Sequence, residues 1–233
     1  MTLLIVAIGG PSSSGKTTVA RALRQVISEA PLVHLDDFYL PDSKIPQHPT
    51  KDVANWDCPE AIDWEKFKKY IEELRLNDAA DLPVKSLEMD TELKLGREEI
   101  DEFDDWAEEI YRRYRGKKIV LVEGFMLFHD KGILDLFDKK LLFHGPYEVL
   151  KKRRESRPGY HTAEGFWKDP PNYFDDIVWP EFKRTHKHLF KNGDVEGKLT
   201  EEAEKQGIRN FNNTGIYNVV EMTEWALKKI AEL

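Results

Sequence analysis

The stretch LLIVAIGGPSSSGKT, Leu3 to Thr17, decides the fold. Its first part, Leu3 to Ile8, is a continuous apolar run of the kind that forms a strand buried on both faces of a parallel sheet. Its second part matches the pattern GxxxxGK[ST], which requires a strand before it and a helix after it. A helical pattern from Lys16 to Ser28 supplies the helix. The stretch therefore predicts a phosphate-binding loop (P-loop) in an α/β fold.

The chemistry of this loop follows from its residue types. Glycines let the backbone curl so that successive amide hydrogens face inward, and the following helix adds its positive end. Lys16 is predicted to bridge the β- and γ-phosphates of ATP, and Thr17 to offer its hydroxyl to Mg²⁺. An accidental glycine-rich turn is the alternative, and the strand and helix on either side disfavour it. The predicted nucleotide-binding residues of the loop are Gly10, Pro11, Ser12, Ser13, Ser14, Gly15, Lys16, Thr17 and Thr18.

Strand and helix patterns alternate along the rest of the chain, which is typical of right-handed βαβ units. Four more apolar runs predict strands, at Pro31–Leu35, Lys118–Val122, Lys140–Phe143 and Ile208–Phe211. The remaining helical patterns lie at Trp64–Arg75, Glu98–Arg115, Tyr147–Arg157, Tyr173–Phe190 and Asn218–Leu233. We expect one domain, residues 1–233, with a parallel sheet of five strands and helices on both faces.

Two segments stand out from this alternation. Residues 77–117 are acidic and poor in β-branched runs, so we interpret them as an insertion. The insertion is either a docking surface or a solvated acidic face, and the second is favoured. Residues 157–173, RPGYHTAEGFWKDPPNY, hold three prolines, two glycines and several aromatics between two helices. They predict a mobile loop over a site, which we call the lid region.

Carboxylates follow two of the predicted strands. Asp36 and Asp37 come directly after the second strand and Glu123 ends the third, so they project at the edge of the sheet where ligands of open α/β folds bind. We predict Asp36 as the catalytic base and a Mg²⁺ ligand, and Glu123 as a second acid at the metal. The alternatives are an Asp pair that caps a turn, and a Glu123 that pairs with Lys16 or caps the next helix.

The run KKRRESR, Lys151 to Arg157, is strongly basic. Arg153 and Arg157 are four residues apart and share one helical face, whereas Arg154 is offset. Planar guanidinium groups suit phosphoryl oxygens, so we predict phosphate contact for this cluster and a catalytic role for Arg153. A solvated helix end that favours the helix dipole is the alternative.

Composition narrows the class of partner. The chain of 233 residues has a formal charge of -8, which disfavours nucleic-acid and membrane-surface binding and favours a small substrate. Cys58 is the only cysteine, which fits a reducing compartment. The apolar run at the N-terminus is too short for a membrane span and lacks the features of a signal peptide. We expect a cytoplasmic monomer.

Six motifs carry a family resemblance: GGPSSSGKTT, DDFYLP, NWDCPEAIDW, VEGFMLF, PYEVLKKRRESR and PNYFDDIVWPEF. In this order and spacing they resemble the nicotinamide riboside kinases, relatives of the uridine kinases among P-loop nucleoside kinases. The match covers nearly the whole chain. The resemblance implies ATP-dependent phosphorylation of the ribose 5′-hydroxyl of nicotinamide riboside, which gives nicotinamide mononucleotide for NAD synthesis.

The resemblance also implies roles for single residues. Asp57 would hold the ribose hydroxyls, Trp56 the base, and Tyr160 would stack on the nicotinamide, although the Pro158-Gly159 pair before it departs from the family pattern. The residues implied at the riboside are Asp36, Asp37, Phe38, Tyr39, Trp56, Asp57, Arg154 and Tyr160. Those implied at ATP, beside the P-loop, are Arg153 and Arg157 at the phosphates and Asn212, Asn213 and Thr214 near adenine.

The complete expectation is a three-layer P-loop NTPase fold with strand order 2-3-1-4-5 and a lid that closes over nucleoside and nucleotide. A uridine, cytidine or other nucleoside kinase is the nearest alternative. A nucleotide-dependent switch would need no catalytic base, so Asp36 disfavours it. A nucleic-acid-acting ATPase is disfavoured by the acidic balance.

Overall fold

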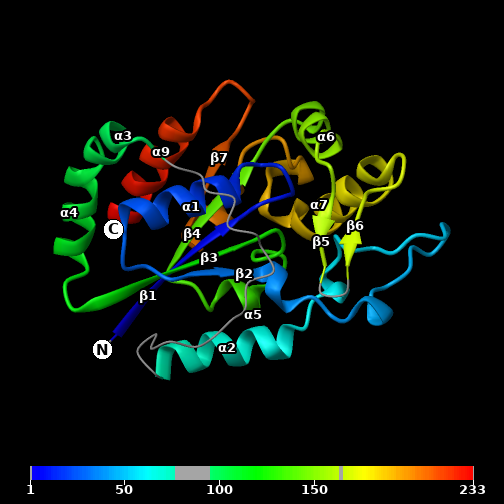
Figure 1. Cartoon of the computed structure of the whole chain (residues 1–233), viewed down its shortest axis with the longest axis horizontal. Helices are drawn as coiled ribbons and strands as arrows, with labels where there is room; N and C mark the ends of the chain where they lie inside the picture. The colour runs from blue at the N-terminus through cyan, green and yellow to red at the C-terminus, as the bar shows by residue number, and fades with distance from the viewer. Residues whose placement is uncertain (1, 77–94, 163–164, 233) are drawn as a thin grey trace.

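The computed structural model describes residues 2–76, 95–162 and 165–232. Its centre is a five-stranded parallel sheet in the order β2-β3-β1-β4-β7 (Figure 1). The strands are β1 (Thr2–Gly9), β2 (Leu32–His34), β3 (Lys117–Gly124), β4 (Lys139–His144) and β7 (Ile208–Asn212). Counted within this sheet, the order is the predicted 2-3-1-4-5. The last strand is labelled β7 because a two-stranded hairpin, β5 (Tyr160–His161) and β6 (Phe166–Trp167), precedes it.

The continuous apolar runs became the central strands because both faces of the sheet are covered. Side chains of β1 alternate between two core clusters, with Ile5 on one face and Val6 on the other. One face packs against α2 (Trp64–Leu76), α5 (Lys131–Leu134) and α7 (Trp179–His186). The other packs against α1 (Lys16–Val26), α4 (Asp104–Arg113) and α9 (Val219–Ala231). Figure 1 shows α1, α4 and α9 together on one side of the sheet and α2 on the other.

The acidic insertion divides into two parts. Residues 77–94 lie outside the described residues, and Glu98–Arg115 forms two helices, α3 (Arg97–Asp101) and α4, where the sequence predicted one. Phe103, Ala107 and Ile110 lie four and three residues apart and are buried, and the hydroxyl of Tyr114 donates to the Ile230 carbonyl at 2.9 Å. This spacing places them on one helical side. The acidic side of α4 is exposed, but its apolar side helps to cover the sheet.

The pattern Tyr173–Phe190 is also interrupted. It contains a π-helical turn, η4 (Phe174–Val178), then α7, then a 3₁₀ turn, η5 (Lys187–Leu189). Pro180 lies where the π-helical turn η4 passes directly into α7, and its missing N–H leaves one gap in the helical hydrogen bonding at that point. The other helices are α6 (Tyr147–Glu155) and α8 (Glu201–Lys205), and the other 3₁₀ turns are η1 (Leu35–Phe38), η2 (Asp42–Lys44), η3 (Pro59–Ala61) and η6 (Lys191–Gly193).

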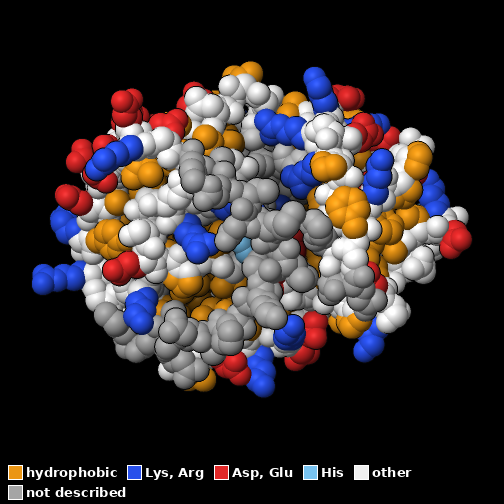
Figure 2. Space-filling model, viewed as in Figure 1, with side chains coloured by type: hydrophobic (Ala, Val, Ile, Leu, Met, Phe, Trp, Pro, Cys, Tyr) orange, Lys and Arg blue, Asp and Glu red, His pale blue; other side chains and the backbone are white. Residues whose placement is uncertain are grey.

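The lid region is more regular than the loop that we expected. Tyr160 pairs with Trp167 in the antiparallel hairpin β5–β6, which lies beside α7 in Figure 1. Basic and acidic side chains are interspersed over the face of the molecule shown in Figure 2, in keeping with the mixed charge of the sequence.

Candidate active site

The P-loop connects β1 to α1 through a backbone that few residues can adopt. Gly10 and Gly15 have φ of 140° and 99°, and Ser13 has φ of 67°. A Cβ on Gly10 would lie 1.8 Å from the Phe143 carbonyl oxygen, so only glycine fits there. The hydroxyls of Ser13 and Ser14 are buried and have no hydrogen-bond partner among the described residues. Buried donors without partners at a helix N-terminus fit the phosphate oxygens of a nucleotide.

Glu123 connects the P-loop to the neighbouring strand β2. One of its oxygens, Oε2, accepts a hydrogen bond from Thr17 Oγ1 at 3.0 Å and lies 3.9 Å from Lys16 Nζ. The other, Oε1, lies 2.8 Å from Nδ1 of His34, whose backbone is in register with that of Glu123. Because a carboxylate oxygen can only accept, His34 carries its proton on Nδ1 if Glu123 is ionised. The four side chains form one connected group at the carboxyl edge of the sheet.

The electrostatics of Glu123 favour its ionised form. Its exposed fraction is 1%, and burial alone would raise the pKa of its carboxyl group. Lys16, His34 and Thr17 outweigh burial and hold the pKa of Glu123 below its ordinary value. A carboxylate beside a threonine hydroxyl fits Mg²⁺, which proteins hold with one or two such ligands while phosphates supply the rest. The residues therefore fit both Mg²⁺ and the nucleotide phosphates.

Asp36 lies in η1, at the same edge of the sheet as Glu123. Burial raises the pKa of the Tyr39 hydroxyl well above its ordinary value, and the charges of Asp36 and Asp57 raise it further. The charge of Asp36 thus contributes to the electrostatics of Tyr39, and the role of Asp36 as the base stays a prediction. Asp37 acts on a different group, because its charge adds to burial in raising the pKa of Tyr70 on α2. The charges of the two adjacent acids thus affect different tyrosines, Tyr39 for Asp36 and Tyr70 for Asp37.

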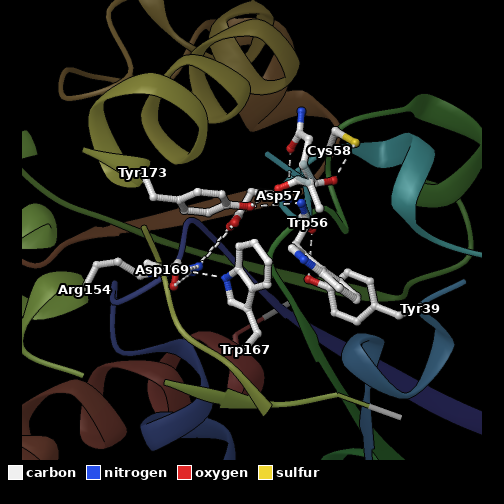
Figure 3. Close-up of polar contacts among 11 residues, drawn as sticks. Tyr39, Trp56, Asp57, Cys58, Arg154, Trp167, Asp169 and Tyr173 are labelled. Atoms are coloured by element: carbon white, nitrogen blue, oxygen red, sulfur yellow. Dashed lines mark hydrogen bonds and ion pairs between the residues drawn. The ribbon is translucent and has the colours of Figure 1, made fainter. Parts of the chain in front are cut away.

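An aromatic wall, which we define as Tyr39, Trp56, Trp167 and Tyr173, lies beside these acids. The Tyr39 hydroxyl donates to the Trp56 carbonyl at 3.0 Å, and the Trp56 N–H donates to the Tyr173 hydroxyl at 3.0 Å. The rings of Trp56 and Trp167 are 5.8 Å apart (Figure 3). Hydrogen bonds with the backbone thus fix the two tyrosines, and the two indoles pack against each other with their planes tilted by 53°.

Phe38, implied at the riboside, does not belong to this wall. Its exposed fraction is 1%, and its ring packs edge-on against Phe67 of α2 with centroids 5.2 Å apart. The described packing thus places Phe38 in the core, and its contact with the riboside stays a prediction. Phe38 anchors η1 in the core and so holds Asp36 at the edge of the sheet.

Arg154 of α6 is buried at the centre of the site. Its guanidinium donates to Asp169 Oδ2 at 2.7 Å and to Ser12 Oγ at 2.8 Å, and it lies 3.3 Å from Asp57 Oδ2. Burial opposes its charge, but Asp57 and Asp169 raise the pKa of Arg154 well above its ordinary value. Arg154 therefore stays charged and joins the P-loop, the acid implied at the ribose, and the lid region.

The other two arginines of the basic run lie differently. Arg153 donates from Nη1 to the Ser13 carbonyl at 3.3 Å and from Nη2 to Asn213 Oδ1 at 3.4 Å. It therefore reaches the P-loop, as predicted for a phosphate contact. Arg157 is exposed, and its guanidinium lies 5.5 Å from the centre of the Tyr160 ring. The structure thus brings Arg153 and Arg154 to the P-loop, whereas Arg157, the first residue of the lid region, lies beside Tyr160.

The residues implied near adenine separate in the same way. Asn213 is fully buried and donates from Nδ2 to the Ser14 carbonyl at 2.9 Å. Its side chain supports the P-loop rather than facing open space. Asn212 is exposed and donates to the Glu196 carbonyl at 3.3 Å, and Thr214 is exposed. Of the three, Asn212 and Thr214 leave their side chains at the surface for a base, and their contact with adenine stays a prediction.

A small cavity of about 10 Å³, room for roughly one water molecule, lies where the P-loop meets the acid implied at the ribose. It is lined by Pro11, Ser12, Asp57, Phe125, Met126, Val178 and Phe182. The pKa of Asp57 is raised above its ordinary value, because burial and the charge of Asp169 together outweigh the opposing charge of Arg154. The cavity therefore places Asp57 beside Ser12 of the P-loop among apolar side chains, and the contact of Asp57 with the ribose stays a prediction.

Comparisons with known proteins decide the family. A model of the phosphoribulokinase/uridine kinase family matches residues 5–157. A nicotinamide riboside kinase of Eremothecium gossypii is 43% identical over 94% of this chain and 90% of its own length. The Saccharomyces cerevisiae and Schizosaccharomyces pombe nicotinamide riboside kinases are 37% and 36% identical, over 99% and 85% of this chain and 97% and 86% of their own lengths. The chain belongs to the nicotinamide riboside kinases of the phosphoribulokinase/uridine kinase family.

Two aromatics of the lid region lie beside the site of this nicotinamide riboside kinase. Tyr160, predicted to stack on the nicotinamide, lies over the guanidinium of Arg154 at 4.3 Å, and its buried hydroxyl has no hydrogen-bond partner among the described residues. Its cross-strand neighbour in the hairpin, Trp167, packs against Trp56. Stacking of Tyr160 on the nicotinamide stays a prediction.

Sequence reasoning missed three residues of this kinase site: His34, Trp167 and Asp169. His34 sits two residues before the predicted base, and its partner on the next strand becomes visible only through the register of β2 and β3. Trp167 and Asp169 were inside the predicted lid region, in the run FWKDPP. An acid and an indole beside a basic helix were the signal that could have found them. No helix among residues 2–76, 95–162 and 165–232 combines the length and apolar character that a membrane span needs.

Proposed function

We propose that this chain transfers the γ-phosphoryl group of Mg-ATP to the 5′-hydroxyl of nicotinamide riboside and forms nicotinamide mononucleotide. Identity of 43% to a nicotinamide riboside kinase over 94% of the chain carries the proposal. The site supports it physically, because a phosphate loop, two acids at the sheet edge and an aromatic wall lie together.

The residues around the P-loop bind and hold the phosphates. Backbone amides and Lys16 grip the triphosphate, and Arg153 approaches from α6 to meet the oxygens of the transferred group. Thr17 and Glu123 would hold Mg²⁺, and when bound this ion neutralises charge on the β- and γ-oxygens. Asp36 accepts the proton of the attacking hydroxyl. Positioning and charge stabilisation thus supply the catalysis.

The aromatic wall selects the riboside. Trp167, which is half-buried and packs against Trp56, offers an indole to the nicotinamide, which carries a positive charge, and aromatic faces attract cations. The carboxylate of Asp57 accepts hydrogen bonds from the ribose hydroxyls. A neutral uracil ring would receive the stacking but not the attraction between a cation and an aromatic face. We further propose a cytoplasmic monomer, in which the buried thiol of Cys58 stays reduced.

A substrate panel tests the proposal. Nicotinamide riboside, uridine and cytidine are each incubated with the enzyme and Mg-ATP, and in parallel with Mg-GTP, and phosphorylated products are identified by mass spectrometry. We expect nicotinamide mononucleotide as the product with the highest kcat/KM. A higher kcat/KM for uridine or cytidine would instead establish a pyrimidine nucleoside kinase, the second function that the family model accommodates.

A further inference from the structure

Asp169, in the lid region, is the closer of two carboxylates that neutralise Arg154. Its Oδ2 accepts from Arg154 Nε at 2.7 Å and its Oδ1 accepts from Nη2 at 3.1 Å. This two-pronged geometry is the strongest that a carboxylate and a guanidinium form. Asp57 meets Nη1 and Nη2 of the same group at 3.4 Å and 3.3 Å. The better-formed ion pair thus comes from the lid region.

The difference in contact geometry gives Asp169 and Asp57 different roles. Arg154 carries one positive charge and faces two negative ones, so one carboxylate can turn to another partner without leaving the buried guanidinium unneutralised. Asp57 holds the looser contact, with distances of 3.4 and 3.3 Å, so it is the acid that can exchange Arg154 for a sugar hydroxyl at the smaller cost. Asp169 then keeps Arg154 charged and in place.

Asp169 also holds the aromatic wall. Its Oδ1 accepts a hydrogen bond from the indole Nε1 of Trp167 at 2.9 Å, and this indole packs against Trp56 (Figure 3). At the other end of the network, Nη1 of Arg154 donates to Ser12 Oγ of the P-loop at 2.8 Å. A continuous set of contacts therefore runs from the wall to the phosphate loop through Trp167, Asp169, Arg154 and Ser12.

The backbone around Asp169 is suited to this task. Pro170 and Pro171 follow it, and a proline restricts both its own backbone and that of the residue before it. The carboxylate is thus held on a stiff segment rather than on a freely moving loop. Its side chain is 19% exposed, which leaves most of the ion pair shielded from solvent.

We propose that Asp169 is a positioning residue that makes the binding of nucleoside and of nucleotide strengthen each other. A base against Trp167 fixes Asp169, Asp169 fixes Arg154, and Arg154 holds Ser12 and with it the P-loop. The same contacts act in reverse when phosphates order the loop, because coupling between two sites is reciprocal. The inference rests on the proposed function, since it takes the wall as the site of the nucleoside base.

Calorimetry measures this coupling directly. The dissociation constant of the non-hydrolysable analogue adenylyl imidodiphosphate with Mg²⁺ is determined without and with saturating nicotinamide riboside. We expect the riboside to tighten analogue binding by about 10-fold in the wild type and by less than about 2-fold in Asp169→Asn. Asp175→Asn is the matched control, because Asp175 also accepts from a cation, Lys151, and from an aromatic hydroxyl, that of Tyr147, outside this network. It should keep the wild-type ratio.

Several outcomes would overturn the proposal. A wild-type ratio near one would do so, as would an unchanged ratio in Asp169→Asn. Equal weakening of both ligands with the ratio preserved would show that Asp169 only supports the structure. Ser12→Ala provides a second test at the other end of the network. As a single substitution it should reduce the factor by which the riboside tightens analogue binding. Combined with Asp169→Asn it should reduce that factor no further than Asp169→Asn does. Independent, additive effects of the two substitutions would contradict transmission through Arg154.

The proposed function fails separately from this inference. If the substrate panel identifies another riboside as the substrate, the same ratio is measured with that riboside, and loss of coupling in Asp169→Asn would still support the role of Asp169. If nicotinamide riboside is phosphorylated and the ratio does not depend on Asp169, the function stands and the inference falls.

Discussion

Glu123 shows how one carboxylate serves two purposes through its two oxygens. His34 binds Oε1 from the neighbouring strand, which leaves Oε2 directed at Thr17 and Lys16. A carboxylate held on one side cannot rotate freely, so less conformational entropy is lost when it meets a metal. The sequence identified Glu123 as an acid at the metal and also as a partner of Lys16, and the geometry allows both.

The predicted base is tested by Asp36→Asn. This substitution keeps the size of the side chain but removes the proton acceptor, so we expect kcat to fall by about 10²–10⁴-fold while adenylyl imidodiphosphate still binds. Steady-state kinetics and calorimetry measure the two effects. Asp37→Asn is the matched comparison, because Asp37 is implied at the riboside but not as the base, and it should therefore lower kcat far less than Asp36→Asn does. Near-normal turnover in Asp36→Asn would remove Asp36 from the mechanism.

The phosphate contact is tested by Lys16→Ala. Loss of the ammonium group removes charge stabilisation at the transferred phosphoryl group, and we expect kcat to fall by about 10²–10³-fold. The exposed Lys69 on α2 provides a control, since its ion pair with Glu73 lies on the surface. Turnover in Lys16→Ala that matched Lys69→Ala would contradict the assignment of the P-loop.

The limits of sequence reasoning are clearest at Tyr160 and Trp167. Which of two aromatics in one segment faces a site depends on strand pairing, and β5 and β6 are two residues long each. Strands this short show no alternation that a pattern could reveal. The lid region was predicted, but the register that turns Tyr160 toward Arg154 is a property of the folded hairpin.

At the scale of elements, the strand–loop–helix unit was predictable and the interrupted helices were not. Buried parallel strands are recognised in a sequence as continuous apolar runs. All five strands of the central sheet lie at the expected places and in the expected order. The patterns Glu98–Arg115 and Tyr173–Phe190 broke because packing, not periodicity, decides where a turn tightens or widens. Tertiary contacts act over distances that a local pattern does not contain.

The P-loop unit is tested by Gly10→Ala. The added Cβ would meet the Phe143 carbonyl at 1.8 Å in a backbone with φ of 140°, so we expect a loss of about 3 kcal/mol or more in the free energy of unfolding. Gly116→Ala is the matched control, because Gly116 also has positive φ, 81°, but a methyl group added to it would meet no described atom within 4 Å. It should cost about 1 kcal/mol.

Urea denaturation of both glycine variants compares the two costs. Both glycines have positive φ, but only Gly10 lies close to Phe143. The difference in unfolding free energy between the two variants therefore measures the steric contact with Phe143 separately from backbone strain. Equal losses of unfolding free energy in Gly10→Ala and Gly116→Ala would show that the contact with β4 is unimportant.

At the scale of the whole molecule, two buried histidines make stability depend on pH. Burial lowers the pKa of His144 to about 4 and that of His186 to about 3. Each ring is neutral in the folded chain, whereas the unfolded chain binds a proton below about pH 6.5. The free energy of unfolding should therefore fall as pH drops from about 6.5 toward 4, by up to about 1.4 kcal/mol per pH unit for each histidine.

Urea denaturation at pH 7.5, 6.5 and 5.5 measures this dependence. His144 lies 3.0 Å from the Val195 carbonyl through Nδ1 and 2.9 Å from Asn210 Nδ2 through Nε2. In His144→Gln an amide can keep one donor and one acceptor without titrating, so the slope between pH 6.5 and 5.5 should decrease by about one proton. A slope equal to that of the wild type would show that His144 is not responsible.

The indoles of Trp56 and Trp167, which pack against each other with centroids 5.8 Å apart, are two of the six tryptophans and place intrinsic fluorescence beside the proposed base site. An electron-poor pyridinium ring stacked on either electron-rich indole would draw charge from its excited state and quench its emission. Uridine, which carries no positive ring, would leave that emission brighter. Arrival of the vitamin-derived riboside can thus be timed in a rapid-mixing experiment without a dye, and its departure as a nucleotide can be followed in the same trace.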